Sequence, residues 1–437
     1  MKSIWQEGVK LPSFPSGEGE LKTDVLIIGG GLAGLLLAYE LESEGVDYLL
    51  VESDKIASKI TKDTTAKITS QHGLIYNSLI SRFGIERSEM YLRANERAVE
   101  KYRKIAEEIK CDFEDKDAVT YSKNDRAILE KELIALEKLG YGAEFAEKLP
   151  LPFDVAGGIV FKNQAQFHPL KFIAGISKNL RILEDTKVEE FGKNSVRTSR
   201  GKITAGKVVV ATHFPILNKH GMYFIKMYQH RSYVLALEGA GEIDGMYVDE
   251  DEKGLSFRNY GKYLLLGGGS HRTGERGGSY PELEEFSRKY YPDAKIKYRF
   301  ATQDCMTLDS VPYIGKYSKN TDNLYVITGF NKWGMTSSMV AADIISSMLL
   351  GRDNDCAEVF SPDRSVITPT LFKNIAKTTI SLITPTTPRC PHLGCALKYN
   401  REEHSWDCPC HGSRFGEDMT LIDNPATDNA KRKGSRI

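Results

Sequence analysis

The sequence predicts an α/β domain, an α+β domain built on an antiparallel sheet, and a small β module toward the C-terminal end. Three observations support this division. A strand–glycine–helix–strand pattern occupies residues 24–52, apolar strands alternate with turn residues over 221–300, and four cysteines gather within 390–410. The first pattern is typical of a parallel α/β sheet, the second of an antiparallel sheet, and the third of a metal site in a small module.

The chain is long enough for about three domains and has the composition of a folded protein. It has 437 residues, of which 41% are hydrophobic and 27% charged, and such a balance is too apolar for a disordered chain. Lys plus Arg and Asp plus Glu both number 59, so a nucleic-acid partner is not expected. The uncharged run 25–39 is shorter than the roughly 20 residues of a membrane helix. Because the N-terminal segment also lacks a signal-peptide pattern, we expect a cytoplasmic protein without a membrane span.

A glycine-rich turn joins the first predicted strand to a helix expected at 32–43, and a second strand follows at 47–51. The turn reads GGGLAG and fits the pattern G-x-G-x-x-G. Its glycines allow a tight turn and close approach to a pyrophosphate, and an acidic residue after the second strand accepts hydrogen bonds from ribose. We therefore expect a dinucleotide here, with contacts from Gly29, Gly31, Leu32, Ala33, Gly34 and Glu52.

Two later segments favour FAD as this dinucleotide. Hydroxyl and backbone N–H groups soon after the βαβ unit can reach the phosphates or the ring of a flavin. A glycine turn before the helix expected at 336–350 directs the positive end of that helix toward a reduced flavin. The expected FAD contacts in these segments, together with one more distant residue, are Thr64, Thr65, Ala66, Lys67, Val188, Gly329, Gly334 and Met335.

The other elements follow from hydrophobic patterning. Charged, periodic stretches at 86–110 and 125–140 predict two exposed amphipathic helices, and 203–213 and 324–328 predict buried strands. The residues 363–385 are rich in threonine and contain proline, and they predict a linker.

The chain resembles the glycine/D-amino-acid oxidase (DAO) family of FAD-dependent oxidoreductases over about residues 20–362. The resemblance is carried by DVLIIGGGLAG with Glu52, and by KVVVATH, FATQDCMTLDSVPYIG and GFNKWGM. It implies a discontinuous FAD-binding domain over 20–90, 150–215 and 300–362. It also implies a substrate domain over 91–149 and 216–299, with an antiparallel sheet above the flavin and a small-molecule substrate.

One departure from the family pattern concerns the substrate. The family often shows W-x-G-x-R-P-x-T-x-D-x-x-P-x-I-G, and here Phe300 replaces the Trp, Thr302 the Gly, and Asp304 stands where the Arg would be. In amino-acid oxidases an Arg near that position clamps the substrate carboxylate, which an Asp cannot do. The substrate is therefore an amine with Asp304 as counter-charge, or Asp304 is only a structural hydrogen-bonding residue.

Several polar residues are candidates for the ring-side catalytic site. Either histidine among them could equally be a packed or capping residue, and the arginines could form ion pairs at the surface. Because hydride removal depends on orientation over the flavin more than on a dedicated base, no base is assigned. The candidates are His72, Tyr233, Arg258, Gln303 and Asp304, with His168 and Arg231 as weaker ones.

Two matching loops near the C-terminal end carry metal-binding residues. They read CPHLGC at 390–395 and CPCHGS at 408–413, and together fit C-x-H-x15-C-x-x-H. Two Cys and two His could hold zinc, but each loop offers one Cys and one His as ligands and contains a second Cys besides. This arrangement resembles a Rieske [2Fe–2S] site. The resemblance implies Cys390 and Cys408 as ligands of one iron and His392 and His411 as ligands of the other. It also implies a disulfide between Cys395 and Cys410.

The predicted cluster module, residues 386–428, is shorter than a complete Rieske domain. Only about 24 residues separate Val366 from Cys390, and Asp418-Met419 replaces the usual D-G turn. Such a short segment can hardly form an independent core. We therefore expect the cluster, the disulfide and docking onto the flavin domain to hold it.

Together the two resemblances imply a dehydrogenase with FAD and a [2Fe–2S] cluster in series. A flavin takes two electrons from an organic substrate, here an amine or amino-acid-like compound, and a cluster accepts them singly. The electrons then pass to an unidentified acceptor. The alternatives are a peroxide-forming oxidase with a structural cluster, and a redox sensor or electron carrier without its own organic substrate.

Overall fold

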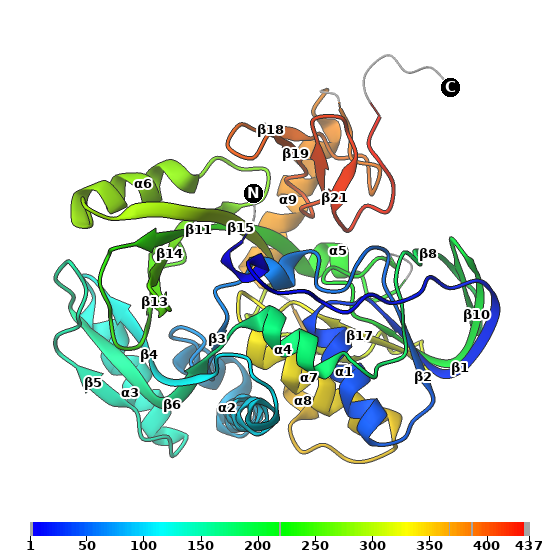
Figure 1. Ribbon diagram of the computed structural model, residues 1–437, viewed down its shortest axis with the longest axis horizontal. Helices are drawn as coiled ribbons and strands as arrows, with labels where there is room; N and C mark the ends of the chain where they lie inside the picture. Colours follow the sequence, from blue (N-terminus) through cyan, green and yellow to red (C-terminus); the bar gives the residue numbers. More distant parts are fainter. Residues whose placement is uncertain (1–2, 218–219, 367, 386–387, 432–437) are drawn as a thin grey trace.

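The computed structural model describes residues 3–217, 220–366, 368–385 and 388–431, which form three sheets. The small C-terminal sheet lies above strands of the second sheet (Figure 1). Residue 367 of the predicted linker, residues 386 and 387 at the predicted start of the cluster module, and the basic end of the chain lie outside the described residues. Within the described ranges, no helix has the length and apolar character needed to cross a bilayer.

The first sheet has eight strands and contains the predicted βαβ unit. Its main path runs β16-β17-β10-β1-β2-β7, with β10, β1 and β2 parallel, and with β8 and β9 paired beside β10. β1 ends in four buried residues because both faces of the sheet are covered. The strands are β1 (Gly19–Ile28), β2 (Tyr48–Val51), β7 (Ile182–Leu183), β8 (Val188–Phe191), β9 (Ser195–Thr198), β10 (Gly201–Val210), β16 (Tyr313–Lys316) and β17 (Leu324–Thr328).

The second sheet has nine strands and is mostly antiparallel, as the alternation over 221–300 predicts. Its path runs β15-β11-β14-β13-β12-β4-β6-β3, and β5 pairs with β6. Only the β12–β4 pair within it is parallel. The strands are β3 (Lys67–Ile68), β4 (Glu114–Ser122), β5 (Glu144–Ala146), β6 (Gly157–Gln166), β11 (Met227–Glu238), β12 (Met246–Asp249), β13 (Ser256–Tyr260), β14 (Tyr263–Arg272) and β15 (Lys295–Thr307).

Helices cover these two sheets. Two of them begin at the glycine turns that the sequence singles out. The helix expected at 86–110 begins earlier, at Tyr76; its first part was missed because Gly84, at φ +81°, interrupts the helical geometry and the periodicity there. Two short 3-10 helices, at Ile4–Gln6 and Ile60–Asp63, lie outside this framework. The helices are α1 (Leu32–Ser43), α2 (Tyr76–Glu108), α3 (Arg126–Lys138), α4 (Pro169–Ile176), α5 (Tyr223–Lys226), α6 (Ser279–Tyr290), α7 (Gly334–Leu349) and α8 (Ala357–Phe360).

The third sheet is a four-stranded antiparallel ladder that carries the two cysteine loops. Its order is β18-β19-β20-β21, and its core is small, with Phe415 and Leu397 packed among the four cysteines. Few apolar side chains support it, as its short length predicts. The strands are β18 (Lys398–Asn400), β19 (Ser405–Asp407), β20 (Arg414–Gly416) and β21 (Leu421–Asp423).

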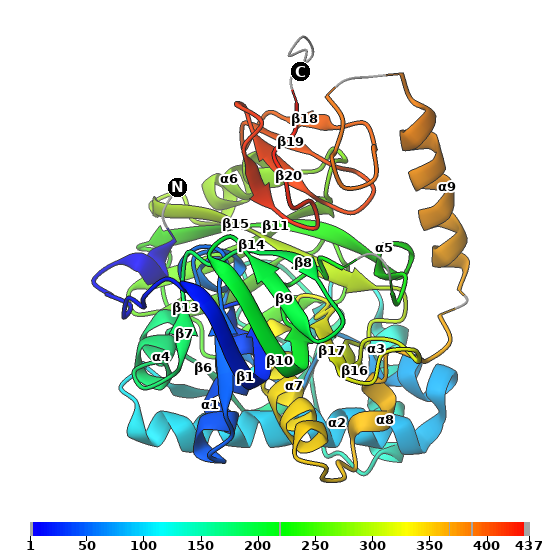
Figure 2. The ribbon, with the colours of Figure 1, turned by 90° about the vertical axis from the view of Figure 1, so that its right-hand side faces the viewer.

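The predicted linker contains a helix, which corrects the sequence interpretation of 363–385. This helix, α9 (Pro369–Ile383), stands beside the C-terminal sheet at the edge of the molecule (Figure 2). The Thr368 side chain caps it by accepting from the backbone N–H of Leu371, at 3.2 Å. A Thr cap followed by Pro is a helix-start signal, which the high content of threonine and proline in the segment obscured.

Two strands lie in a different sheet from the one that the predicted domain ranges give them. β3 and β6 fall within 20–90 and 150–215, which we assigned to the FAD-binding domain, but both belong to the nine-stranded sheet. β6 pairs with β4 from Gly157 to Gln166. Partners so distant in sequence leave no local pattern, so the strands could not be assigned to a sheet beforehand.

Candidate cofactor sites and substrate cavity

The glycine turn between β1 and α1 is shaped by close backbone contacts. A Cβ on Gly34 would lie 2.0 Å from the carbonyl oxygen of Gly29, and a Cβ on Gly29 would lie 2.5 Å from that of Ala211. Only glycine fits at these points. The Glu52 carboxylate, at the end of β2, accepts a hydrogen bond from the Gly30 N–H at 2.7 Å, which fixes its position beside the turn.

This turn opens into a cavity of about 1070 Å³, the size class of a large cofactor with its substrate. Of the residues predicted to contact FAD, Gly34 and Ala66 do not line it: Gly34 packs α1 against the turn, and Ala66 is fully buried behind the wall. The others do, namely Gly29, Gly31, Leu32, Ala33, Glu52, Thr64, Thr65, Lys67, Val188, Gly329, Gly334 and Met335. The residues present therefore fit a dinucleotide with a ring system at the far end.

His72 lies in the cavity wall, but its ring is fully engaged. Its Nδ1 is 2.6 Å from the Tyr91 hydroxyl, its Nε2 is 2.9 Å from Thr336 Oγ1, and its ring stacks on Trp333 at 5.0 Å. Burial lowers the pKa of His72 to about 3, so the ring stays neutral. This environment suits a packed histidine that orders the wall, and not a proton acceptor.

Asp304 lines the cavity from β15 and faces a charged rim. Burial raises the pKa of Asp304 to about 6, against the opposing effect of Lys332 and Arg231. Lys332 also lines the cavity, as do the four acidic residues 249–252 at the end of β12 and in the loop that follows it. At neutral pH Asp304 is therefore mainly ionised and can act as a counter-charge at the wall.

The other ring-side candidates separate into a wall residue and supporting residues. Tyr233 belongs to the cavity lining, but its hydroxyl is 2.9 Å from His271 Nε2 and donates to Glu403 of the C-terminal module at 3.3 Å, so this hydroxyl points toward the module. Arg258 does not line it: its Nη1 donates to the carbonyl oxygens of Thr65 and Ala66, at 2.8 and 2.7 Å, and burial lowers its pKa to about 9. Arg258 thus holds the 64–66 loop from behind, and its placement as a ring-side residue is corrected.

Three more candidates lie away from the cavity. His168 caps α4 by accepting from the Lys171 N–H at 3.3 Å, which is the capping role considered from the sequence. Arg231 is buried and pairs with Glu403 of the C-terminal module, so it does not form a surface pair. Gln303 also faces that module, and its placement beside the ring is corrected. On a strand, alternate side chains point to opposite faces, so Asp304 and Gln303 cannot share one.

The cysteine and histidine loops form a compact cluster of possible metal ligands. Cys390 and Cys408 are buried, free thiols, and the hydrogen bond of Cys408 lowers the pKa of Cys390 to about 7. The rings of His392 and His411 lie 5.0 Å apart. Both ring nitrogens of His411 are buried and have no hydrogen-bond partner among the residues described. Such orphaned nitrogens beside paired thiols fit a metal centre with two sulfur and two nitrogen ligands.

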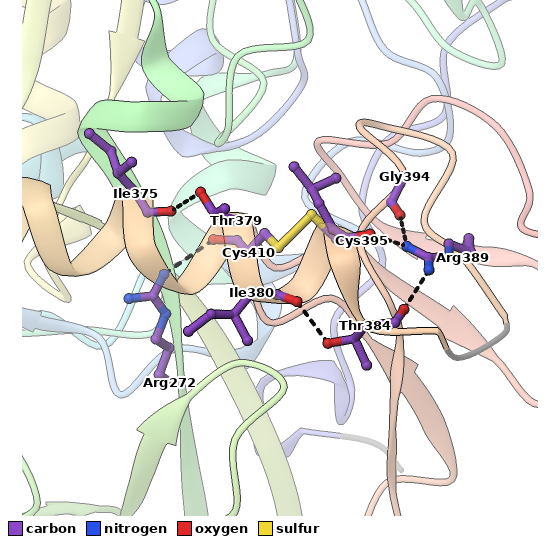
Figure 3. The surroundings of a disulfide bond; sticks show 10 residues. Arg272, Ile375, Thr379, Ile380, Thr384, Arg389, Gly394, Cys395 and Cys410 are labelled. Atoms are coloured by element: carbon purple, nitrogen blue, oxygen red, sulfur yellow. Dashed lines mark hydrogen bonds between the residues drawn. A yellow bond between two sulfur atoms is a disulfide. The ribbon is translucent and has the colours of Figure 1, made fainter.

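Cys395 and Cys410 form a disulfide that joins the two loops (Figure 3). The three sulfur atoms of Cys395, Cys410 and Cys408 all lie within 4.8 Å of one another. Each loop is also closed on itself by a backbone hydrogen bond. The Gly394 N–H donates to the carbonyl oxygen of Cys390, and the Gly412 N–H donates to that of Cys408. The loops are therefore preorganised by covalent and backbone bonds.

The cluster loops sit on β11 and β15 through a buried amide pair that the sequence did not indicate. The Nε2 of Gln229 donates to the carbonyl oxygens of His411 and Asn424, at 2.8 and 2.9 Å. The Nε2 of Gln303 donates to Gly412 and to Gln229 Oε1, at 2.9 and 2.6 Å. A Cβ on Gly412 would lie 2.5 Å from the side chain of Gln229, so the contact is tight.

The C-terminal module also forms part of the cavity wall. Asn424 reaches across to the opposite side, where its Nδ2 donates to the carbonyl oxygen of Phe214 at 2.8 Å. The ring of Phe214 in turn contacts His411, at 6.5 Å between centroids. The module residues that line the cavity are Leu421, Asp423, Asn424, Ala426 and Thr427. One wall thus belongs to both the cavity and the cluster module.

Comparison with known proteins agrees with both sites. The model of the FAD dependent oxidoreductase (DAO) family matches residues 24–348, and the model of the Rieske [2Fe-2S] domain matches residues 381–433. A protein of Bacillus subtilis (strain 168) with the name "Putative Rieske 2Fe-2S iron-sulfur protein YhfW" is 34% identical, over 99% of this chain and 97% of its own length.

Two further proteins match about four fifths of the chain. The gamma-glutamylputrescine oxidoreductase of Escherichia coli (strain K12) is 23% identical over 78% of this chain and 87% of its own. The crystal structure of glycine oxidase from Geobacillus kaustophilus is 16% identical and superposes with a TM-score of 0.67, over 79% of this chain and all of that one. This likeness shows a shared fold.

Proposed function

The chain belongs to the DAO family of FAD-dependent oxidoreductases and carries a Rieske [2Fe–2S] domain, and on this premise we propose that it oxidises a small amine and delivers the electrons through the cluster to an acceptor. It is an enzyme with two cofactors, FAD and the [2Fe–2S] cluster. FAD supplies two-electron oxidation of a C–H bond and the cluster supplies one-electron transfer.

The observation that carries the proposal is the shared wall. Five residues of the cluster module line the cavity that begins at the glycine turn, and the Gln229–Gln303 pair fastens the second cluster loop to the strand that carries Asp304. The module that holds the proposed cluster ligands thus forms part of the cavity wall, which a module with a purely structural role would not need to do. The arrangement therefore supports direct electron transfer and favours a dehydrogenase over a peroxide-forming oxidase.

Within the cluster module, the ligand assignment is part of the proposal. We assign Cys390 and Cys408 to one iron, and His392 and His411 to the other. The adjacency of the thiols and of the imidazoles supports this division. Imidazole ligands on one iron raise the potential of the cluster relative to an all-cysteine cluster, which suits an acceptor of electrons from a flavin.

The charge of the cavity supports an amine as substrate. Asp304 offers a carboxylate in the wall, and residues 249–252 add further negative charge to the lining, although Lys332 opposes it in part. Other basic residues also line the cavity, namely Lys55, Lys59, Lys67, Arg82 and Lys187. An ammonium group gains more beside the Asp304 carboxylate than a carboxylate does. The resemblance to gamma-glutamylputrescine oxidoreductase, whose name denotes an amine-bearing compound, agrees with this choice.

Anaerobic mixing tests the proposal. The holoenzyme is mixed with panels of amines and of D- and L-amino acids while flavin absorbance and the EPR signal of the reduced cluster are recorded. We expect an amine to bleach the flavin and then to reduce the cluster. Stoichiometric peroxide in air without cluster reduction would establish the oxidase instead, and no reduction by either panel would favour a sensor or carrier.

A further inference from the structure

The helix α9 presents its large apolar side chains to solvent and packs the polar side chains of Asn374 and Ser381 against the protein. Asn374 and Ser381, two turns apart, are 4% and 8% exposed, and Asn374 accepts a hydrogen bond from Arg272 at 2.6 Å. The exposed face carries five large apolar side chains, which are Phe372 (64% exposed), Ile375 (44%), Ile380 (62%), Leu382 (41%) and Ile383 (74%). An amphipathic helix on a soluble protein has the opposite orientation.

This apolar face continues onto the first cluster loop. Leu393, next to the proposed ligand His392, is 38% exposed, and a Cβ on Gly394 would lie 4.0 Å from Leu382. Arg389 ties helix and loop together by donating to the carbonyl oxygen of Leu382 at 2.9 Å. It also donates to that of Gly394 at 2.8 Å (Figure 3). The face and the loop therefore form one surface, which we call the α9 face (Phe372, Ile375, Ile380, Leu382, Ile383 and Leu393).

We infer that the α9 face binds the surface of an anionic lipid bilayer. The face is a single convex helix with aliphatic side chains and Phe372, the pattern of a helix that lies in the interface plane. Protein interfaces are instead enriched in aromatic residues, Met and Arg and depleted in Lys, whereas five of the six side chains of the α9 face are aliphatic.

The charge of the helix complements anionic lipids. Its sequence, PTLFKNIAKTTISLI, contains two lysines and no acidic residue, in a chain whose net charge is zero. Lys373 is exposed at the border of the apolar face, and Lys377, which pairs with Glu275, is 46% exposed. The cytoplasmic leaflet, which faces the location expected from the sequence, carries the negative surface potential that such lysines favour.

Binding in this orientation places the loop of His392 beside the bilayer. The ring of His411 packs against Phe214 and Phe224 of the flavin part, whereas His392 lies on the loop that joins the α9 face. The loop of His392 is thus the one that is continuous with the proposed lipid-binding surface.

Vesicle co-sedimentation of the holoenzyme tests the inference. The probe is vesicles of equal parts phosphatidylcholine and phosphatidylglycerol, with phosphatidylcholine alone as the neutral comparison. We expect binding to the anionic vesicles, and the variants Ile380→Glu and Ile383→Glu should weaken it about tenfold or more, since a carboxylate at the headgroup level opposes insertion and anionic lipid.

The matched control is Ile134→Glu. Ile134 is 52% exposed and lies on α3, which is far in sequence from the α9 face. It should bind as the unchanged protein does, and all variants should keep the flavin and cluster spectra. Equal binding by Ile383→Glu, or no binding to anionic vesicles, would overturn the inference. Self-association in sedimentation velocity that Ile383→Glu abolishes, without vesicle binding, would also overturn it and assign the face to a second copy.

Discussion

At the residue scale, the proposed substrate class depends on the single side chain of Asp304. Its carboxylate stands where related enzymes place a cation, and burial raises its pKa to about 6 without removing its charge at neutral pH. The sequence indicated this residue, because the DAO-family pattern has an Arg where this chain has Asp304. Its neighbour Gln303 was assigned to the same site, although strand alternation sends its side chain to the cluster module.

The pH dependence of substrate binding tests the role of Asp304. Below about pH 6 the carboxyl binds a proton and loses its attraction for an ammonium group, so KM for the reducing amine should rise as the pH falls. The Asp304→Asn variant should lose about 30-fold in kcat/KM, from about 2 kcal/mol for a desolvated charge pair, and its KM should no longer vary near pH 6. Steady-state kinetics with an artificial acceptor provides the measurement.

Asp293→Asn, an exposed substitution of the same kind, should leave the kinetics unchanged. If Asp304→Asn kept the full pH dependence of KM, the counter-charge role would be excluded and a structural role for Asp304 would remain.

At the scale of elements, local segments were predicted well and distant partners were not. The βαβ unit was predicted because strand, glycine turn, helix and acidic residue follow one another within a short stretch of chain, and each has a physical reason. α9 was missed because Thr and Ile have only moderate helix propensity and its position before the cluster loops suggested a linker. The placement of β6 depends on β4, so no local pattern could reveal it.

The closeness of α1 to the glycine turn predicts a severe effect of one methyl group. In Gly34→Ala the new Cβ would meet the carbonyl oxygen of Gly29 at 2.0 Å, so helix and turn must separate. We expect a loss of about 3 kcal/mol or more in the free energy of unfolding, typical of strain in a packed core, and loss of bound FAD. Urea unfolding and flavin absorbance after gel filtration would measure both.

Gly142→Ala provides the comparison, because a Cβ there meets nothing within 4 Å and its φ is not positive. It should match the unchanged protein in both measurements. Retention of FAD by Gly34→Ala at ordinary stability would show that the turn can adjust and that its close packing does not matter.

At the scale of the whole molecule, a charged network joins the cluster module to the flavin part. Glu403 accepts from Arg231 Nε at 3.0 Å and pairs with Arg414 at 3.0 Å. Burial alone would raise the pKa of Glu403, but the two guanidinium groups outweigh it and hold the pKa below its ordinary value. The contribution of Glu403 to the free energy of unfolding is therefore present at neutral pH and is lost as acid protonates the carboxylate.

Removal of this charge should loosen the module. In Glu403→Gln, Arg231 stays buried at 2% exposure without its carboxylate partner, at a cost of about 3–5 kcal/mol. We expect faster release of the C-terminal module in limited proteolysis and slower cluster reduction after anaerobic amine addition. The neighbouring Glu402→Gln, at an exposed position, is the matched control and should behave as the unchanged protein. Equal proteolysis of the two variants would show that docking does not depend on this pair.

The position of residues 421–427 in the cavity wall also has a consequence for biogenesis. A ribosome completes the glycine turn near residue 29 long before it adds this last wall, so flavin that binds early meets a site still open on one side. The wall closes only when the small module folds, and because its own core is slight we expect that folding to depend on its iron and its disulfide. Retention of the flavin should thereby be linked to the iron supply of the cell, and we expect a chain made under iron starvation to lose both cofactors together.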